Sequence, residues 1–185
     1  MTGSSPDPRV VCVDVDYRET IAVAAGVWLR GWTASEPELE VVTTLDEVAP
    51  YQPGEFYRRE LPCLLAVLER GPTPDVVVVD GYVWLGPGRP GLGAHLYQAL
   101  GERAVVVGVA KSRFLSATDA VPVYRGNSRS PLYVTAAGVS AEEAAGWVAG
   151  MHGLHRIPGL LKRVDHLARG WRGLTNRVSF GCAEP

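Results

Sequence analysis

The sequence contains few cysteines, and their spacing excludes the common cysteine motifs. Cys12, Cys63 and Cys182 form no Cys-x-x-Cys pair, and three thiols cannot all pair within one chain. A disulfide framework is therefore not expected. Reduced thiols are typical of a cytosolic protein, so we expect a cytoplasmic location.

The sequence also lacks a long apolar run and a signal-peptide core. No stretch approaches the roughly 20 apolar residues of a membrane-spanning helix. The first eight residues, MTGSSPDP, contain no apolar segment. We therefore expect a soluble protein with no membrane partner, in which residues 1–8 form a disordered lead-in.

Neither sign of charge dominates the chain. Its 18 basic and 20 acidic residues give a net charge of −2, so nucleic-acid binding would need a local basic patch. The candidate patch lies in Arg156–Arg177 and contains one acid, Asp165. Its basic residues are Arg156, Lys162, Arg163, Arg169, Arg172 and Arg177. A solvated helical face is the alternative, but in an otherwise acidic chain we favour a phosphate-facing patch.

What the sequence does contain is a strand with two carboxylates on one face. In Arg9–Tyr17 every second residue from position 11 to 15 is a valine, so Asp14 and Asp16 share the opposite face. Burying both carboxylates is costly unless a cation compensates them. An edge strand whose acidic face meets water is the alternative. A second valine strand, Asp75–Val79, also ends in a carboxylate, Asp80, which favours a shared site.

The order of the expected elements predicts one mixed sheet. Three strands, over residues 9–17, 21–33 and 39–44, follow one another without a helix and form an antiparallel meander. A helix, a strand, a helix and a strand come next, over residues 61–68, 75–79, 92–100 and 104–110. Right-handed crossovers make these later strands parallel. The prediction is a ribonuclease H-like α/β fold flanked by helices, with the first and fourth strands adjacent.

The later part of the chain completes this domain. Pro131–Ala136 is expected to be a strand, and the capping box at Ser140 starts a helix that ends near Gly150. A last helix is expected over Gly159–Arg169. With 185 residues and no internal repeat, we expect a single domain at 9–170 and a C-terminal tail at 171–185.

Three carboxylates on separate elements predict a metal site. Pro62 is expected in the first turn of its helix, which places Glu60 at the mouth of that helix, in addition to Asp14 and Asp80. Carboxylate oxygens suit Mg²⁺ or Mn²⁺. Such ions activate water and stabilise the leaving oxygen in phosphodiester hydrolysis. Any one of these acids alone would more often be a surface residue or a helix cap.

Seven ordered blocks of this sequence resemble the endonuclease V family, the deoxyinosine 3′-endonucleases. The blocks are Val13-Asp14-Val15, Pro50-Tyr51-Gln52-Pro53-Gly54, Arg59-Glu60-Leu61-Pro62, Val79-Asp80-Gly81, Gly108-Val109-Ala110-Lys111, Pro131-Leu132-Tyr133-Val134 and Arg156-Ile157-Pro158. The resemblance extends from about Val10 to about Arg169. It implies a metal-dependent endonuclease that cleaves DNA or RNA on the 3′ side of inosine. We expect the protein to be a monomer.

The resemblance also implies roles for individual residues. Asp14, Glu60 and Asp80 match the metal ligands of the family, and Lys111 matches the lysine near the scissile phosphate. His166 falls where family members carry a His or an Asp near the metals. Without the family context, Lys111 would be assigned as a solvated lysine at a strand end and His166 as a surface or interface residue.

Two further positions concern the base. Tyr51 matches the aromatic wedge of the family, which can stack where a base has been pulled out. A loop tyrosine that covers the core is the alternative. Gly81 matches backbone that lines the pocket for the extruded hypoxanthine.

Other positions depart from the family pattern. A polar residue and a glycine are replaced by Tyr82 and Val83, and the family's Gly-His is replaced by Ala136-Ala137. These departures keep two alternatives open: a related nuclease with another single-stranded or structured substrate, and a non-catalytic nucleic-acid-binding module. The complete set of Asp14, Glu60, Asp80 and Lys111 argues against the binding module.

Overall fold

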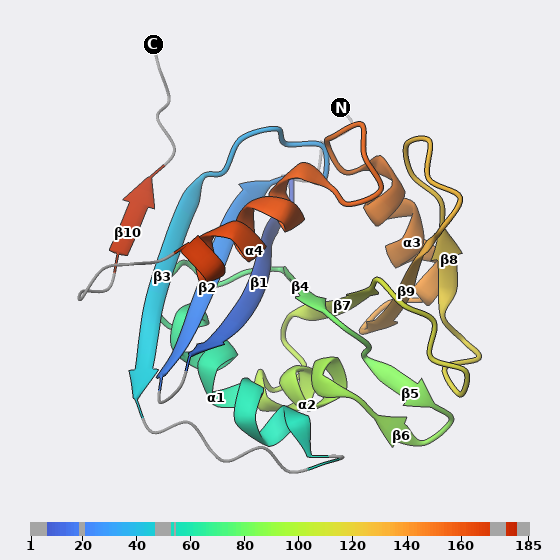
Figure 1. The fold of residues 1–185 in the computed structure, drawn as a ribbon, viewed down its shortest axis with the longest axis horizontal. Helices are drawn as coiled ribbons and strands as arrows, with labels where there is room; N and C mark the ends of the chain where they lie inside the picture. Colours follow the sequence, from blue (N-terminus) through green and yellow to red (C-terminus); the bar gives the residue numbers. More distant parts are fainter. Residues whose placement is uncertain (1–6, 19–20, 47–52, 54, 171–176, 181–185) are drawn as a thin grey trace, which may run out of the picture.

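A mixed sheet of eight strands runs through the part of the chain that the structure describes (Figure 1). The structure is a computed structural model that describes residues 7–18, 21–46, 53 and 55–170, together with the backbone of 177–180. The strands of the sheet are β1 (Arg9–Arg18), β2 (Ile21–Arg30), β3 (Leu39–Asp46), β4 (Val76–Asp80), β7 (Val105–Ala110), β8 (Val121–Val123), β9 (Leu132–Ala137) and β10 (Arg177–Phe180). A separate hairpin consists of β5 (Trp84–Gly86) and β6 (Arg89–Pro90).

The strand pairing confirms the predicted ribonuclease H-like arrangement. The first three strands pair antiparallel as a meander. β1 then pairs in parallel with β4, and β4 in parallel with β7, while β9 and β8 extend that side antiparallel. In the β1–β4 ladder Val13 lies opposite Val79. Asp14 and Asp80 each follow one of these valines, so they emerge at the same end of the sheet.

Helices cover both faces of the sheet and bury its valine-rich strands. α1 (Phe56–Leu68) and α2 (Leu92–Ala99) pack on one face, against residues such as Val11 and Val77. α3 (Ala141–Gly150) and α4 (Gly159–Gly170) pack on the other, against residues such as Val10 and Val78. Strands whose side chains are buried on both faces are typical of the parallel centre of such a sheet.

The structure corrects the predicted start of the first helix. α1 begins at Phe56, so Pro62 lies inside the helix and Glu60 lies in its second turn, not at its mouth. Pro62 lacks the N–H that would otherwise bond to the carbonyl four residues earlier. The helix continues past it because Cys63, Leu64 and Val67 bury its apolar face. Tertiary packing therefore outweighs the local cost of the proline.

The predicted capping box agrees with the structure, whereas the predicted end of the second strand and the predicted tail differ from it. Ser140 accepts a hydrogen bond from the Glu143 backbone N–H at 3.1 Å, as the capping box predicts. β2 ends three residues earlier than expected, at Arg30. β10 pairs antiparallel with β3, which places residues 177–180 of the expected tail in the sheet. The expected lead-in lies largely outside the described residues, and among those described no helix is long and apolar enough to cross a membrane.

Candidate active site

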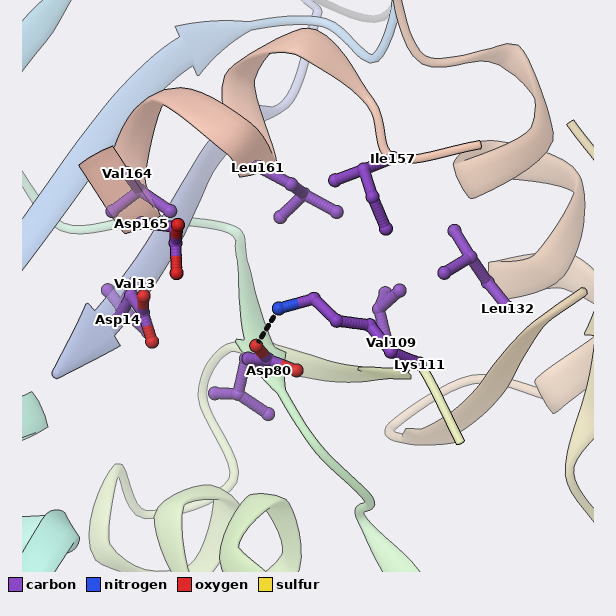
Figure 2. Close-up of a pocket in the computed structure, with 11 residues that line it drawn as sticks. Val13, Asp14, Asp80, Val109, Lys111, Leu132, Ile157, Leu161, Val164 and Asp165 are labelled. Carbon is purple, nitrogen blue, oxygen red and sulfur yellow. Dashed lines mark hydrogen bonds and ion pairs between the residues drawn. The ribbon is translucent and has the colours of Figure 1, made fainter. Parts of the chain in front are cut away.

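Asp14, Asp80 and Lys111 meet at the carboxyl ends of β4 and β7, beside the middle of β1, just beyond the last pair of the β1–β4 ladder (Figure 2). Asp14 follows the buried part of β1, Asp80 ends β4, and Lys111 comes directly after β7. The Lys111 Nζ lies 2.5 Å from an Asp80 carboxylate oxygen, and both side chains remain about two-fifths exposed. Parallel strands deliver their carboxyl ends to one edge of a sheet, which explains how residues nearly 100 positions apart converge.

Asp16 is directed to a different partner. Its carboxylate pairs with the Arg18 guanidinium at 3.2 Å. It does not line the pocket at the end of the sheet, whereas Asp14 does. Of the two aspartates on this face of β1, Asp14 is therefore the one that lies beside Asp80 and Lys111.

The pocket combines carboxylates with an apolar wall. Figure 2 shows Asp14, Asp80 and Asp165 facing it together with Lys111. Its remaining lining residues are apolar: Val13, Val79, Val109, Leu132, Ile157, Leu161 and Val164. Three carboxylates face one ammonium group, so the pocket carries excess negative charge in surroundings that screen charge weakly.

This environment perturbs the Asp14 carboxyl group. Burial, followed by repulsion from Asp80, raises its pKa from 3.8 to about 6. Asp165 adds to the repulsion, while the Val15 backbone N–H and Lys111 oppose it. Carboxyl groups with raised pKa values often lie at functional sites, where a cation or a proton offsets their charge.

Glu60 does not line this pocket, but its pKa is the most strongly raised among the three predicted metal ligands. Its residue is 7% exposed, and its Oε2 atom has no hydrogen-bond partner among the described residues. Burial, then repulsion from Asp14 and Asp80, raises the pKa of Glu60 from 4.5 to about 8. An unsatisfied buried carboxylate is costly, so the folded chain favours a proton or a cation at this position.

The donor chemistry of these residues fits a hard divalent cation. Asp14, Glu60 and Asp80 offer only carboxylate oxygens, which Mg²⁺ and Mn²⁺ accept. With Asp80 turned towards Lys111, no three acidic, His or Cys side chains of the described residues converge tightly enough to form a ready-made metal site. The fit rests on the unsatisfied Glu60 oxygen and the mutual repulsion of the three acids.

Asp165 is a pocket residue that the sequence reasoning missed. It lies on α4, lines the pocket with Asp14 and Asp80, and pairs with Arg169 at 2.8 Å. His166, the residue chosen from the family resemblance, is exposed and lines a neighbouring hollow that Asp165 and Lys111 also border. Leu161, Val164 and Asp165 are spaced i, i+3 and i+4, so they lie on one face of the helix. This spacing would have indicated that Asp165, and not His166, faces the sheet.

Gly81 and Tyr82 shape the loop after Asp80. Gly81 has φ = +135°, and a Cβ added to it would meet no atom within 4 Å, so the side of the residue where a side chain would stand is open. Its backbone N–H donates to the Val109 carbonyl at 3.2 Å. The Tyr82 hydroxyl donates to the Ser112 carbonyl at 2.7 Å and accepts from the Phe114 N–H at 2.9 Å. Tyr82 thus ties the segment after Lys111 to the segment after Asp80.

Tyr51 and Ala136 are two further positions that the family resemblance singles out. Tyr51 lies outside the described residues. The backbone carbonyl of Ala136, one of the two alanines that replace Gly-His, accepts a hydrogen bond from the Trp84 indole at 2.9 Å. Trp84, which directly follows the altered Tyr82-Val83, is therefore bonded to the altered Ala136-Ala137 segment.

The raised pKa values predict how the stability of the metal-free protein depends on pH. The folded state holds protons on Asp14 and Glu60 that the unfolded chain releases, so stability falls as pH rises from about 4 to 8. Glu60→Gln should flatten this decline and melt higher than wild type at pH 8, with little difference at pH 4.5. Melting curves in chelator measure this effect.

Glu69→Gln provides a matched control, since Glu69 is exposed at the C-terminal end of the same helix. It should leave the pH profile unchanged. If the melting temperatures of wild type and Glu60→Gln change with pH in parallel across this range, the assignment of a buried, protonated Glu60 is contradicted.

Comparison with known proteins identifies the relatives of this chain. The endonuclease V family model matches residues 2–153. Endonuclease V of Streptomyces coelicolor is 41% identical over 128 residues, which cover 67% of this chain and 53% of the relative. Endonuclease V of Streptomyces avermitilis is 32% identical over 188 residues, which cover 87% of this chain and 79% of the relative. The chain thus spans about half of the first relative and four-fifths of the second.

Solved structures agree with these sequence matches. A crystal structure of Streptomyces avermitilis endonuclease V has a TM-score of 0.73 at 30% identity and covers 89% of this chain and 82% of that one. A crystal structure of Ciona intestinalis endonuclease V, in complex with a 24mer DNA containing an inosine followed by a ribo-adenosine, has the same TM-score at 21% identity. That match covers 89% of this chain and 85% of the Ciona chain. The second likeness supports the fold alone. With its matching family model, its relatives and its ribonuclease H-like sheet, this chain belongs to the endonuclease V family of nucleases.

Proposed function

We propose that this protein is a metal-dependent endonuclease that cleaves the phosphodiester on the 3′ side of inosine in DNA or RNA. The observation that carries the proposal is the group of mutually repelling carboxylates beside Lys111, at the sheet end of a chain from the endonuclease V family. The inosine-containing DNA bound by the Ciona relative supports the choice of substrate.

The proposed metal ligands are Asp14, Glu60 and Asp80. We assign Mg²⁺ as the ion, with Mn²⁺ as a substitute, because nucleases of this family generally use a divalent metal and the donors are all hard oxygens. A bound ion of this type lowers the pKa of water and neutralises charge on a leaving oxygen. Asp165 lies close enough to affect Asp14 and adds to the negative field.

Lys111 is the proposed partner of the scissile phosphate. In the structure its ammonium pairs with Asp80 and lines the carboxylate pocket. Compensation of Asp80 by a cation would free this ammonium for a phosphate oxygen, where it would stabilise developing negative charge. The salt bridge thus holds Lys111 beside the site without burying it.

His166 and the base-recognition residues complete the proposal. We retain His166 as a catalytic candidate that would act from the hollow beside the pocket, with Asp165 as the α4 residue that faces the carboxylates directly. Gly81 is the proposed backbone contact to the extruded base, since space is open on the side where a side chain would stand. Tyr51 is the proposed wedge that stacks in place of that base.

The altered loops favour one second candidate, a related nuclease with a shifted substrate. Tyr82 replaces the usual polar residue after Gly81 and bonds to the segment that follows Lys111. In either case we propose a monomer in the cytoplasm, and the unpaired, buried thiols of Cys12 and Cys63 support that location.

A nicking assay on matched DNA and RNA strands, with and without one inosine, tests the proposed function. With Mg²⁺ or Mn²⁺, wild type should cleave on the 3′ side of the inosine, and chelator should abolish cleavage. Asp80→Ala should lose cleavage yet melt no lower than wild type without metal, because the substitution relieves carboxylate repulsion. Inosine-independent cleavage would favour the second candidate, and wild-type nicking by Asp80→Ala would refute the metal-site assignment.

The wedge assignment predicts different effects for two substitutions of Tyr51. Stacking on an aromatic ring contributes roughly 1–3 kcal/mol per base, so Tyr51→Ala should weaken binding of the inosine strand about ten- to hundredfold. Tyr51→Phe keeps the ring and should be nearly silent. Affinity and melting temperature are measured on both variants. If Tyr51→Ala melts lower but binds as tightly as wild type, Tyr51 covers the core and is not a wedge.

A further inference from the structure

A second hollow adjoins the carboxylate pocket and is rich in basic groups. Its walls are the segment that precedes α4 and one side of α4 itself, and Lys111 borders both cavities. The hollow is lined by Lys111, His155, Arg156, Ile157, Leu161, Lys162, Asp165 and His166. The carboxylate among these, Asp165, already pairs with Arg169 at 2.8 Å. The hollow therefore favours an anion.

Lys162 is the basic residue of this hollow that is best placed to meet a ligand. It is exposed, and it forms none of the ion pairs found among the described residues. Its neighbour Arg163 instead pairs with the nearly buried Glu40 and with Glu36. Adjacent residues of α4 thus have different tasks: one holds the helix to β3 and its preceding loop, and the other faces the hollow.

A buried arginine fixes the wall opposite α4. Arg125 is 6% exposed, and its guanidinium donates to the carbonyls of His155 and Gly153 at 3.0 Å each, and to that of Met151. These bonds hold the segment that carries His155 and Arg156 in one conformation. A wall held by several charge-assisted hydrogen bonds is preorganised, so a ligand need not order it on binding.

Arg156 joins this wall to the catalytic end of the sheet. Its guanidinium donates to the Lys111 carbonyl and to the Pro131 carbonyl, the latter at 2.8 Å. Its Nε atom is buried and has no partner within the described part of the chain. The guanidinium therefore fixes the backbone of Lys111 and keeps an uncompensated positive charge beside the hollow.

We propose that this hollow binds the phosphate group adjacent to the scissile phosphate. The inference rests on the proposed function, since it takes the neighbouring pocket as the site of cleavage. The two cavities share Lys111, Asp165, Ile157 and Leu161, so a strand in the pocket presents its next phosphate to the hollow. Lys162 provides the direct ionic contact, and Arg125 and Arg156 are positioning residues for the wall.

The salt dependence of strand binding tests this proposal. A contact between one cation and one phosphate of a single strand contributes about 0.7 to the slope of log affinity against log salt concentration. Lys162→Gln should reduce the wild-type slope by about that amount and weaken binding several-fold at low salt. Lys162→Arg should restore both. Anisotropy measurements on a labelled strand in chelator, over a salt series, give the slopes.

Arg103→Gln is the matched control for the loss of one positive charge. Arg103 is exposed and precedes β7, whereas Lys111 follows β7, so the two lie at opposite ends of the same strand. The control should keep the wild-type slope. Equal slopes for Lys162→Gln and Arg103→Gln would overturn the proposal.

The choice of strands separates failure of this inference from failure of the proposed function. Phosphate contacts carry no sequence information, so Lys162→Gln should change the slope equally for strands with and without inosine. If wild type shows no inosine dependence yet the slope still falls, the hollow binds phosphate and the proposed specificity is wrong. If wild type cleaves 3′ to inosine but the slope does not fall, the hollow assignment is wrong.

A strand with one uncharged methylphosphonate linkage locates the phosphate. Neutralising the linkage next to the cleavage position, on one side or the other, should weaken wild-type binding but leave Lys162→Gln almost unaffected, because the two changes remove the same contact. Additive losses at both neighbouring linkages would refute the assignment.

Discussion

Repulsion among carboxylates that the fold forces together is the constraint on which the site depends. The parallel pairing of β1 with β4 sets Asp14 and Asp80 at one end of the sheet, and α1 brings in Glu60 from the opposite face. Burial of Glu60 removes the water that would otherwise screen these charges. The metal-free fold tolerates this cost because the valine-rich strands and four packed helices stabilise it elsewhere. A divalent cation relieves the same cost. The repulsion that destabilises the metal-free fold is therefore also what favours metal binding.

The basic side chains near these carboxylates have two different roles. Lys111 pairs with Asp80 but stays exposed, so it can exchange a carboxylate for a phosphate. The buried guanidinium of Arg125 bonds to backbone carbonyls, and that of Arg156 does the same at the pocket edge, so they act by fixing the loop before α4. The expected phosphate-facing patch over Arg156–Arg177 is therefore divided in the part of the chain that the structure describes, and the side chains of Arg172 and Arg177 lie outside that part. Arg163 and Arg169 pair with acids of the protein, and Lys162 faces the hollow.

Sequence reasoning predicted the sheet and the two carboxylates at its end because both follow from local patterns. Valine alternation in β1 and the valine run of β4 placed Asp14 and Asp80, and the capping box at Ser140 located α3. It failed where tertiary packing overrides a local rule. Pro62 was expected near a helix start, yet buried contacts along α1 carry the helix across it. Asp165 was passed over for His166 because family position cannot say which of two adjacent helical residues faces inward, whereas helical periodicity could. No local pattern indicates that Arg125 bonds to a segment about 30 residues later.

Proton release on Mg²⁺ binding is the measurement that tests this account most directly. At pH 7 a Glu60 carboxyl with a pKa of about 8 is mostly protonated, whereas Asp14, with a pKa of about 6, is mostly ionised. Binding of the ion should therefore displace about one proton at pH 7 and almost none above pH 9, as calorimetry in buffers of different ionisation enthalpy would show. Glu60→Gln should displace almost none at either pH. Saturating Mg²⁺ binding at pH 7 without proton release, or with the same release in Glu60→Gln, would contradict the claim that the metal replaces a buried proton in this carboxylate cluster.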